Sequence, residues 1–209
     1  MLSFDEFFNA CSGLWKTERI YHSLLEEQIE RSYTEFRVEL ISQAQKQEIL
    51  TQSDISNLET AKLIEQKKFP GFAITFDTRS ETGETVSMSL QALFIPDTYL
   101  PTQALTPELP PPPLSAQVAL EPGLIQGFYL RDKGYSEAGA ISGRFSYQPV
   151  RQTLEMTTYY QRSVAVDQMR FVTPDVRMRT IVTYQRPPEG KIPTTIDLIG
   201  FGVERRYSA

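Results

Sequence analysis

The sequence contains one cysteine and one histidine among its 209 residues. The single cysteine, Cys11, excludes an internal disulfide and any metal cluster held by several cysteines, and it fits a reducing compartment. The single histidine, His22, excludes zinc sites that need two histidines. A Ser-His-Asp triad would depend on His22 alone, and the chain has no G-x-S-x-G segment to supply its serine. Most common hydrolase and metalloenzyme classes are therefore excluded, and we expect no metal site.

Long basic runs and long apolar runs are also missing. The chain has 26 Asp and Glu against 21 Lys and Arg, so nucleic acid is not an expected partner. The longest apolar runs fall far short of the roughly 20 residues that a membrane-spanning helix needs. The N-terminal MLSFDEFFNA is acidic and lacks the apolar centre of a secretory signal. We therefore expect neither a nucleic-acid partner nor a membrane span.

One helix is predicted at the N-terminus. Aromatic residues at helical spacing follow Ser3, with Glu6 three residues further on. This pattern indicates a short helix, Phe4–Cys11, capped by Ser3 and stopped by Gly13.

Most of the remaining chain reads as β-strands, because β-branched and aromatic residues recur between polar turns. In RSYTEFRVELIS the bulky positions are Tyr33, Phe36, Val38 and Leu40, whereas residues 43–66 stay open between strand, loop and short helix. The other predicted strands are LWKTERIYHSLL, GFAITFDT, TVSMSLQALFIP, GLIQGFYLR, ISGRFSYQP, TLEMTTYYQRSVAVDQMRFVTP, VRMRTIVTYQR and TTIDLIGFGVERRY. Eight to ten antiparallel strands after one helix predict an all-β, up-and-down barrel, which has room for side chains or one small ligand.

A proline-rich segment, residues 96–122, interrupts the strands. Seven prolines fall between Pro96 and Pro113, and Pro122 follows. Such a segment makes no central strand, and each flanking block has too few strands for a domain of its own. We therefore expect a single domain, 1–209, with a loop insertion at about 96–122 outside the barrel; a true domain boundary is the alternative.

The tripeptide Gly13-Leu14-Trp15 follows the predicted helix and precedes a strand. This order is the entry pattern of lipocalin-like barrels, in which the indole plugs one end and a late arginine packs over it. Arg205 or Arg206 would make that cation–π contact. The alternative is an ordinary core tryptophan.

Two arginine-bearing strands carry the first candidate site residues. Strand alternation places Arg19 and Tyr21 on one face and His22 on the other. His22 is either a catalytic group or a surface or hydrogen-bonded residue. Arg177 and Arg179 share a face, and two guanidiniums on one face need anions.

These anions would come from an internal carboxylate such as Asp167 or from a ligand that carries carboxylates. A solvated strand face is the alternative.

The stretch GFYLRDKGYSEAGAISGRFSY, Gly127 to Tyr147, combines glycines, aromatics and charges. Gly134 and Gly143 bracket a hairpin tip, across which Glu137 and Arg144 would pair. The segment is either a glycine-rich hairpin with a surface salt bridge or a rim where a charged ligand enters.

Three segments in order, FFNACSGLWKTERIYH, GFYLRDKGYSEAGAISGRFSY and MRFVTPDVRMRT, resemble blocks of the S/U-type phycobiliprotein lyases, the CpcS/CpeS group. The resemblance spans nearly the whole chain. It implies a lipocalin-like barrel that attaches an open-chain bilin, phycocyanobilin or phycoerythrobilin, by a thioether bond to a cysteine of an apo-phycobiliprotein subunit. The bilin is a substrate, and no tightly bound cofactor is implied. The compartment would be the cyanobacterial cytoplasm or the plastid stroma.

The resemblance also implies roles for residues. Arg19 and Arg177 would hold bilin carboxylates or ring oxygens. Asp167 occupies the position at which the family tends to have Glu, and it would contact the pyrrole nitrogens. His22 would lie near ring A. We therefore expect a catalytic set of Asp167, Arg177 and His22. The expected ligand-binding set is Arg19, Tyr21, Glu137, Arg144, Arg179 and Phe76.

The chain departs from the family pattern in several places. Tyr21-His22 replaces the two adjacent histidines of the family, and Met169 or Arg170 occupies the position of a family tryptophan. Phe72 and Phe76 lie where the family has a tryptophan-rich segment. These departures leave four alternatives to a complete lyase. They are a partner subunit of a heteromeric or dimeric lyase, a bilin carrier or chaperone, a fatty-acid-type lipocalin, and an assembly factor that binds apo-phycobiliprotein without pigment.

Overall fold

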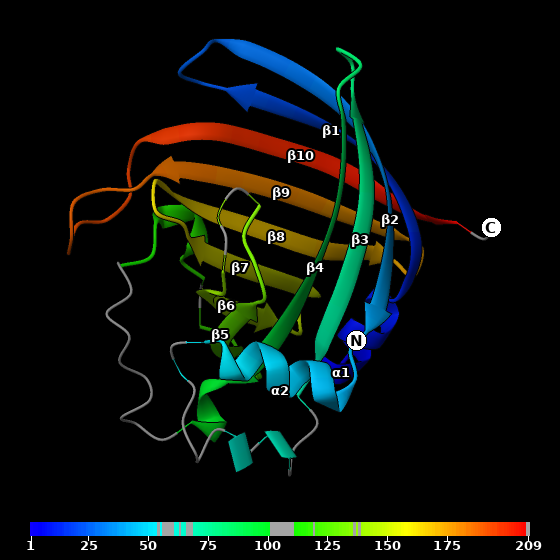
Figure 1. Cartoon of the computed structure of the whole chain (residues 1–209), viewed down its shortest axis with the longest axis vertical. Coiled ribbons are helices and arrows are strands. Elements are labelled where there is room, and N and C mark those ends of the chain that lie inside the picture. The colour runs from blue at the N-terminus through cyan, green and yellow to red at the C-terminus, as the bar shows by residue number, and fades with distance from the viewer. Residues whose placement is uncertain are drawn as a thin grey trace.

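A computed structural model of the chain describes residues 1–53, 55, 61–62, 64–65, 69–100, 111–118, 120–135, 137 and 139–207. Ten antiparallel strands form one closed barrel in which each strand pairs with its sequence neighbours and β1 closes onto β10 (Figure 1). The strands are β1 (Gly13–Ser23), β2 (Gln28–Leu40), β3 (Gly71–Ser80), β4 (Thr85–Pro96), β5 (Ile125–Arg131), β6 (Ile141–Gln148), β7 (Thr153–Tyr159), β8 (Ser163–Thr173), β9 (Val176–Gln185) and β10 (Ile196–Tyr207). The predicted all-β, up-and-down antiparallel barrel is confirmed.

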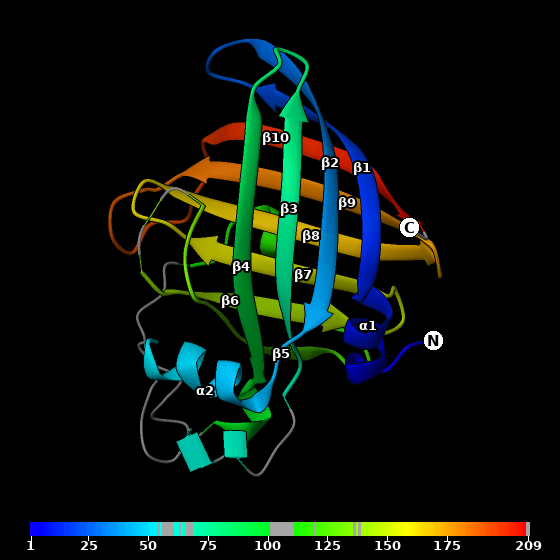
Figure 2. The same ribbon diagram turned by 45° about the vertical axis from the view of Figure 1, so that its right-hand side comes forward.

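Helix α1 (Phe4–Cys11) plugs one end of the barrel (Figure 2). The Ser3 hydroxyl accepts from the backbone of Glu6, and the Glu6 carboxylate accepts from the backbone of Ser3, so the predicted capping box is present. Phe7 and Phe8 are buried among aromatic residues of the strands. At the opposite end, the β1–β2 and β3–β4 hairpins rise beyond the other strands (Figures 1 and 2).

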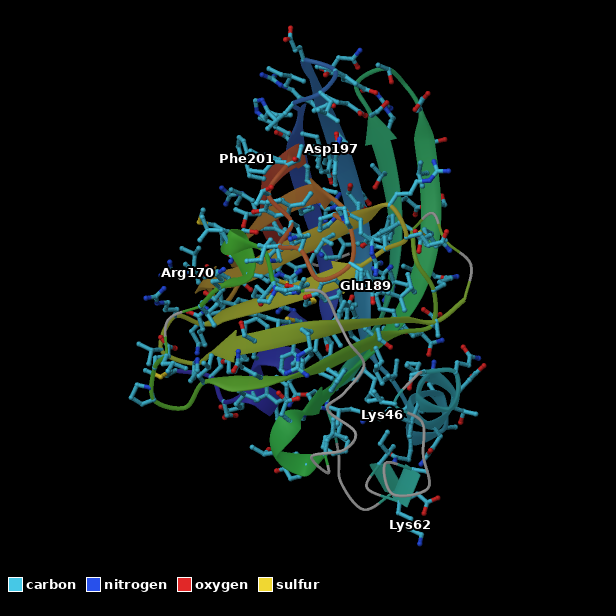
Figure 3. The ribbon with its side chains drawn as sticks, turned by 90° about the vertical axis from the view of Figure 1, so that its left-hand side faces the viewer. Lys46, Lys62, Arg170, Glu189, Asp197 and Phe201 are labelled. Atoms are coloured by element: carbon cyan, nitrogen blue, oxygen red, sulfur yellow. The ribbon has the colours of Figure 1, made fainter. Side chains whose placement is uncertain are left out.

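Alternation along each strand separates an inner from an outer face. In β2, Thr34, Phe36 and Val38 are buried on the inner face, and Phe36 lies opposite Trp15 of β1. Tyr33, which the sequence analysis grouped with these bulky positions, is 41% exposed because it has the opposite parity. Outward residues of β8 and β10, such as Arg170 and Phe201, project from the barrel wall (Figure 3).

A second helix, α2 (Gln43–Thr51), forms where the sequence left strand, loop and helix open. Ser42 caps it with Gln45 in a second capping box. Its Ile49 and Leu50 pack with outward residues of β4 and β5, including Leu93. The barrel therefore has an outer apolar layer in addition to its interior.

The described flanks of the proline-rich segment lie against the outside of the barrel. They include two short 3₁₀ turns, η1 (Asp97–Tyr99) and η3 (Leu114–Ala116). Ala116 packs with outward residues of β7 and β8, and Gln168 Nε2 donates to the Ser115 carbonyl at 3.0 Å. The centre of the predicted insertion, 101–110, lies outside the described residues. Within the described ranges, no helix combines the length and apolarity needed to cross a membrane.

Candidate functional site

The floor of the barrel interior is Trp15, whose side chain is fully buried. Its Nε1 donates to the Cys11 carbonyl at 2.9 Å, which ties β1 to the end of α1. The Arg206 guanidinium carbon lies 4.5 Å from the indole centroid, and the same guanidinium donates to carbonyls at the end of α1. The predicted tryptophan–arginine contact is therefore made by Arg206, whereas Arg205 has the opposite, outward parity.

Arg177 covers the floor from the interior side. Its guanidinium carbon lies 3.9 Å from the Trp15 centroid, and its Nη2 lies 2.7 Å from Glu204 Oε2. Only 2% of its side chain is exposed. The predicted shared face of Arg177 and Arg179 is confirmed and points inward, and Arg177 contacts protein groups on two sides.

Glu204 is the centre of an ionic cluster that strand register assembles. Thr17 of β1 and Arg177 of β9 lie directly opposite it on the two neighbouring strands. Besides Arg177, the guanidiniums of Arg19 and Arg179 lie 3.4 and 3.5 Å from Glu204 Oε1. Full burial would raise the pKa of Glu204, but these three guanidiniums more than offset it and lower the pKa below its usual range. Glu204 is therefore a buried carboxylate anion.

Asp167 supplies the second carboxylate of the cluster. Arg179 Nε donates to its Oδ1 at 2.8 Å and to Oδ2 at 3.1 Å, and Arg179 Nη2 forms a further short ion pair with Oδ2. The side chains of Arg179 and Asp167 are 13% and 20% exposed. The predicted internal carboxylate thus satisfies Arg179, and this pair forms the more accessible part of the cluster.

The cluster borders a cavity of about 30 Å³ that is also lined by Tyr129 and Tyr135. This volume suits only a water molecule or two. Phe76 lies on the inner face of β3, with its ring centroid 6.1 Å from that of Tyr135. Because Tyr135 is 55% exposed and lies in the β5–β6 loop, it is the group that a larger ligand would displace.

Two further predicted residues lie on opposite sides of β1. Tyr21 faces inward, and its hydroxyl accepts from Arg19 Nη1 at 3.4 Å. His22 faces outward, where its ring stacks on Phe201 with a centroid separation of 6.2 Å. The structure therefore groups Tyr21 with the arginine cluster and separates His22 from it.

The predicted pairing of Glu137 with Arg144 is wrong. Arg144 lies on the outer face of β6, where it forms an ion pair with Asp97 and lies 4.5 Å from the Phe128 ring centroid. Glu137 Oε1 instead accepts from the Gln161 backbone at 2.7 Å. Arg144 has outward parity, whereas the loop carries Glu137 towards the β7–β8 turn.

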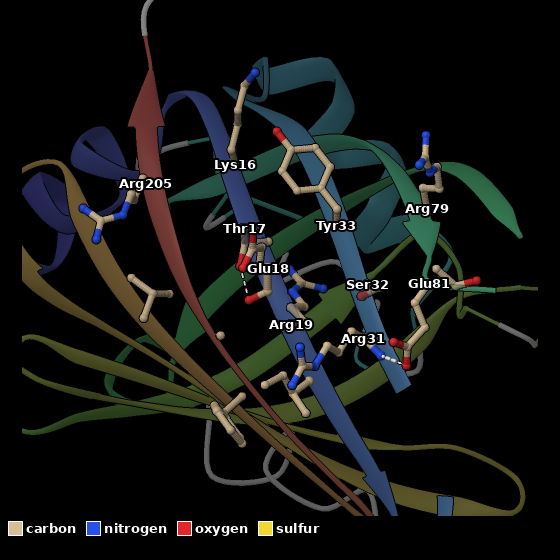
Figure 4. Close-up of a pocket in the computed structure, with 15 residues that line it drawn as sticks. Lys16, Thr17, Glu18, Arg19, Arg31, Ser32, Tyr33, Arg79, Glu81 and Arg205 are labelled. Carbon is tan, nitrogen blue, oxygen red and sulfur yellow. Dashed lines mark hydrogen bonds between the residues drawn. The ribbon is translucent and has the colours of Figure 1, made fainter. Parts of the chain in front are cut away.

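A hollow of about 780 Å³ lies over β10, β1, β2 and β3 (Figure 4). Many of its lining side chains have outward parity, among them Lys16, Tyr33, Arg79 and Arg205. Inward residues, among them Thr17 and Arg19, also line it, so the hollow reaches the edge of the ionic cluster at Arg19.

Sequence reasoning missed two interior residues, Glu204 and Arg131. The available signal was a charged residue on the inward parity of a strand whose other inward positions are apolar or glycine, in GFYLR, and a charged inward position beside the predicted Arg206 in GFGVERRY. Glu204 meets Arg19 only because barrel closure brings β10 beside β1.

A closed ten-stranded barrel with a helical plug, a tryptophan floor and a charged interior defines the chain as a lipocalin-like barrel protein. The model of the CpeS-like protein family matches residues 3–103 and 114–207, and the chain belongs to this family.

Relatives and a solved structure extend this comparison. A relative named chromophore lyase CpcS/CpeS 1, from Synechococcus sp. (strain JA-3-3Ab), is 36% identical over 205 residues, which cover 98% of this chain and 97% of the relative. Chromophore lyase CpcS/CpeS 2 from Synechocystis sp. is 26% identical over 84% of this chain and 77% of its own length. The solved S-type phycobiliprotein lyase CPES from Guillardia theta superposes with a TM-score of 0.62. It covers 100% of this chain and 95% of its own at 17% identity, which supports the fold alone.

Proposed function

We propose that this chain is a chromophore lyase that binds an open-chain bilin and attaches it by a thioether bond to a cysteine of an apo-phycobiliprotein. The observation that carries the proposal is the interior cluster of Arg19, Arg177, Arg179, Asp167 and Glu204 above the Trp15 floor. The names of the curated relatives support the same activity.

The cluster matches the polar groups of a bilin, which has two propionates and four pyrrolic nitrogens. Guanidiniums suit propionates because they donate parallel hydrogen bonds to both oxygens. Arg19 Nε has no hydrogen-bond partner among the described residues, and Arg179 is partly exposed. Asp167 would accept from pyrrole N–H groups and favour the protonated, more electrophilic chromophore. Arg19, Arg179 and Asp167 are therefore the groups of the cluster best placed to meet a ligand.

The thiol of the reaction comes from the acceptor protein. Cys11 is only 2% exposed, and burial raises its pKa, so it has little thiolate at neutral pH. The acceptor thiolate would add to the ring A ethylidene carbon and form the C–S bond, and the π electrons would pass into the chromophore, which takes up a proton. The lyase presents the bilin and holds its charges during this addition.

His22 stays a predicted catalytic residue, but its outward position limits what it can do. From the outer face it would act where the acceptor protein contacts the barrel, and not on a bilin inside it. A His22→Gln variant that binds bilin normally and transfers it slowly would support this role. Unchanged transfer would remove His22 from the mechanism.

Titration of phycocyanobilin and phycoerythrobilin into the purified protein, followed by absorption, tests the binding step. Arg179→Gln should weaken binding by about 1–3 kcal/mol, the usual value for a hydrogen bond to a charged group. Arg177→Gln should weaken binding similarly but also loosen the floor, because Arg177 contacts Trp15 and Glu204. Arg37→Gln, on an exposed part of β2, is the matched control. If the folded Arg179→Gln variant binds bilin with wild-type affinity, the bilin site lies elsewhere.

Addition of an apo-phycobiliprotein subunit tests the transfer step through the appearance of a covalent, fluorescent product. Asp167→Asn should reduce transfer more than binding, if the carboxylate tunes the pyrroles. Binding without transfer by the wild type would instead favour a bilin carrier, or a subunit that needs a second chain. Asp167 already accepts hydrogen bonds from Arg179. This favours the carrier function, because a carrier does not need a carboxylate that is free to act on the pyrroles. The proposed setting is a cyanobacterial cytoplasm or a plastid stroma.

A further inference from the structure

Arg131 is a buried cation without a carboxylate. It is the last residue of β5, faces the interior opposite Ala92 of β4, and is 2% exposed. Its Nη1 donates to the Tyr160 hydroxyl at 2.9 Å, and its guanidinium carbon lies 4.5 Å from the Tyr135 ring centroid. In the part of the chain that the structure describes, no carboxylate forms an ion pair with it.

The other three interior arginines above the floor are paired. Arg19 and Arg177 contact Glu204, and Arg179 contacts both Glu204 and Asp167. A buried guanidinium without an anion is unfavourable, because it has lost water without gaining an opposite charge. Arg131 is therefore a site at which an added anion would be stabilised.

The free atoms of Arg131 have a definite geometry. Nε and Nη2 have no hydrogen-bond partner among the described residues. These two nitrogens form one edge of the planar guanidinium, and their parallel N–H groups fit the two oxygens of a carboxylate. The Tyr160 hydroxyl occupies Nη1, which leaves the bidentate edge available.

Tyr135 connects Arg131 with the arginine cluster. Its ring lies against the Arg131 guanidinium and also lines the small cavity beside Arg177 and Arg179. A ligand that displaced this half-exposed ring would contact both cationic sites at once.

We propose that Arg131 is a second carboxylate-binding group of the barrel: its Nε and Nη2 take one bilin propionate, and the cluster of Arg19 and Arg179 takes the other. The inference rests on the proposed function and deepens it. The guanidiniums of Arg19, Arg131, Arg177 and Arg179, together with the carboxylates of Asp167 and Glu204, give this group of described residues a net charge of two positive. The two propionates of one bilin match this excess.

The test compares phycocyanobilin with its dimethyl ester, which keeps the chromophore but removes both negative charges. Arg131→Gln should weaken binding of the diacid about tenfold or more, the effect of losing a charged hydrogen bond. Binding of the diester should stay within about twofold of the wild type. Arg37→Gln is the matched surface control, and thermal melting checks the fold of each variant.

A merely structural Arg131 would weaken diacid and diester equally, and that result overturns the proposal. Wild-type diacid affinity in Arg131→Gln overturns it too, while the proposed function stands. If the wild type binds neither pigment, the proposed function fails and the inference fails with it.

If Arg131→Gln does not fold, the wild-type protein still decides the question through the ¹⁵N-labelled Arg131 Nε–H NMR signal. This signal should shift with the diacid and not with the diester. The same shift with both ligands overturns the proposal.

Discussion

Arg177 lies between an aromatic ring and a carboxylate: its guanidinium carbon is 3.9 Å from the Trp15 centroid, and its Nη2 is 2.7 Å from Glu204. The contact joins β1, β9 and β10 at the floor of the barrel. It fixes the position of the Arg177 guanidinium at the base of the ionic cluster. The more exposed pair, Arg179 and Asp167, is held above this floor.

Glu204→Gln should destabilise the fold strongly, because it leaves three guanidiniums without their shared anion. The loss of one partner from a buried ion pair costs about 3–5 kcal/mol. Urea unfolding followed by Trp15 fluorescence measures it. Glu39→Gln, which alters only an exposed pair with Arg37, should change stability little. Equal stabilities of the two variants would contradict the role of Glu204 as the centre of the cluster.

Glu155 should make stability depend on pH near neutrality. Its side chain is buried on the outer face of β7, and burial raises its pKa to about 7, although Thr157 and Ser146 donate to it. The folded protein therefore holds this proton more tightly than the unfolded chain. This contribution is fully present below about pH 4.5 and is lost as pH rises through about 7.

The wild type should lose up to about 3 kcal/mol from this group between pH 5 and 8. Glu155→Gln stays neutral and should lack this part of the loss. Melting temperatures of both proteins across this range measure the difference. Parallel curves would show that Glu155 does not titrate there.

Gly143→Ala should destabilise the barrel because the strands leave no room for a Cβ. The added atom would lie 2.3 Å from the Thr157 carbonyl oxygen. Gly139 has φ +90° and open space around the position of a Cβ, so Gly139→Asn, whose side chain tolerates positive φ, is the control. Unfolding should show a loss above 1 kcal/mol, typical of overpacking, for Gly143→Ala alone. Equal losses of stability in the two variants would contradict the steric role of the Gly143–Thr157 contact.

Cys11 should take no part in the transfer reaction. A thiol reagent should modify it slowly in the native protein and rapidly in urea, because its side chain is buried. Cys11→Ala should bind and transfer bilin like the wild type, with a modest loss of stability from the small cavity. A loss of transfer with normal bilin binding would show that the lyase uses its own thiol.

Much of the local structure followed from the sequence. The spacing of aromatics after Ser3 predicted α1, and alternation placed Arg177 and Arg179 on one face and His22 on the face opposite Tyr21. These predictions depend on backbone geometry over a few residues, which neighbouring side chains determine. The strand pattern predicted the barrel, which the closed ten-stranded sheet confirms, and the resemblance predicted the family, which the family match confirms.

Pairing across the sheet did not follow from the sequence. Glu137 and Arg144 are seven residues apart, yet Arg144 forms its ion pair with Asp97, at the start of the proline-rich segment. Glu204 accepts a hydrogen bond from Arg19, which is 185 residues away in the sequence. Such contacts depend on strand order and register, and no local pattern encodes either.

The sequence by itself determined the helix Phe4–Cys11 and the shared face of Arg177 and Arg179, because these follow from helical spacing and period-two alternation. Only the tertiary structure decided which charges meet. Closure of β1 onto β10 brought Arg19 to Glu204, the pairing of β9 with β10 brought Arg177 and Arg179 there, and the register of β5 left Arg131 buried with no ion-paired carboxylate among the described residues. These contacts depend on strand pairing and register in the closed barrel, which bring together charges that are separated along the chain.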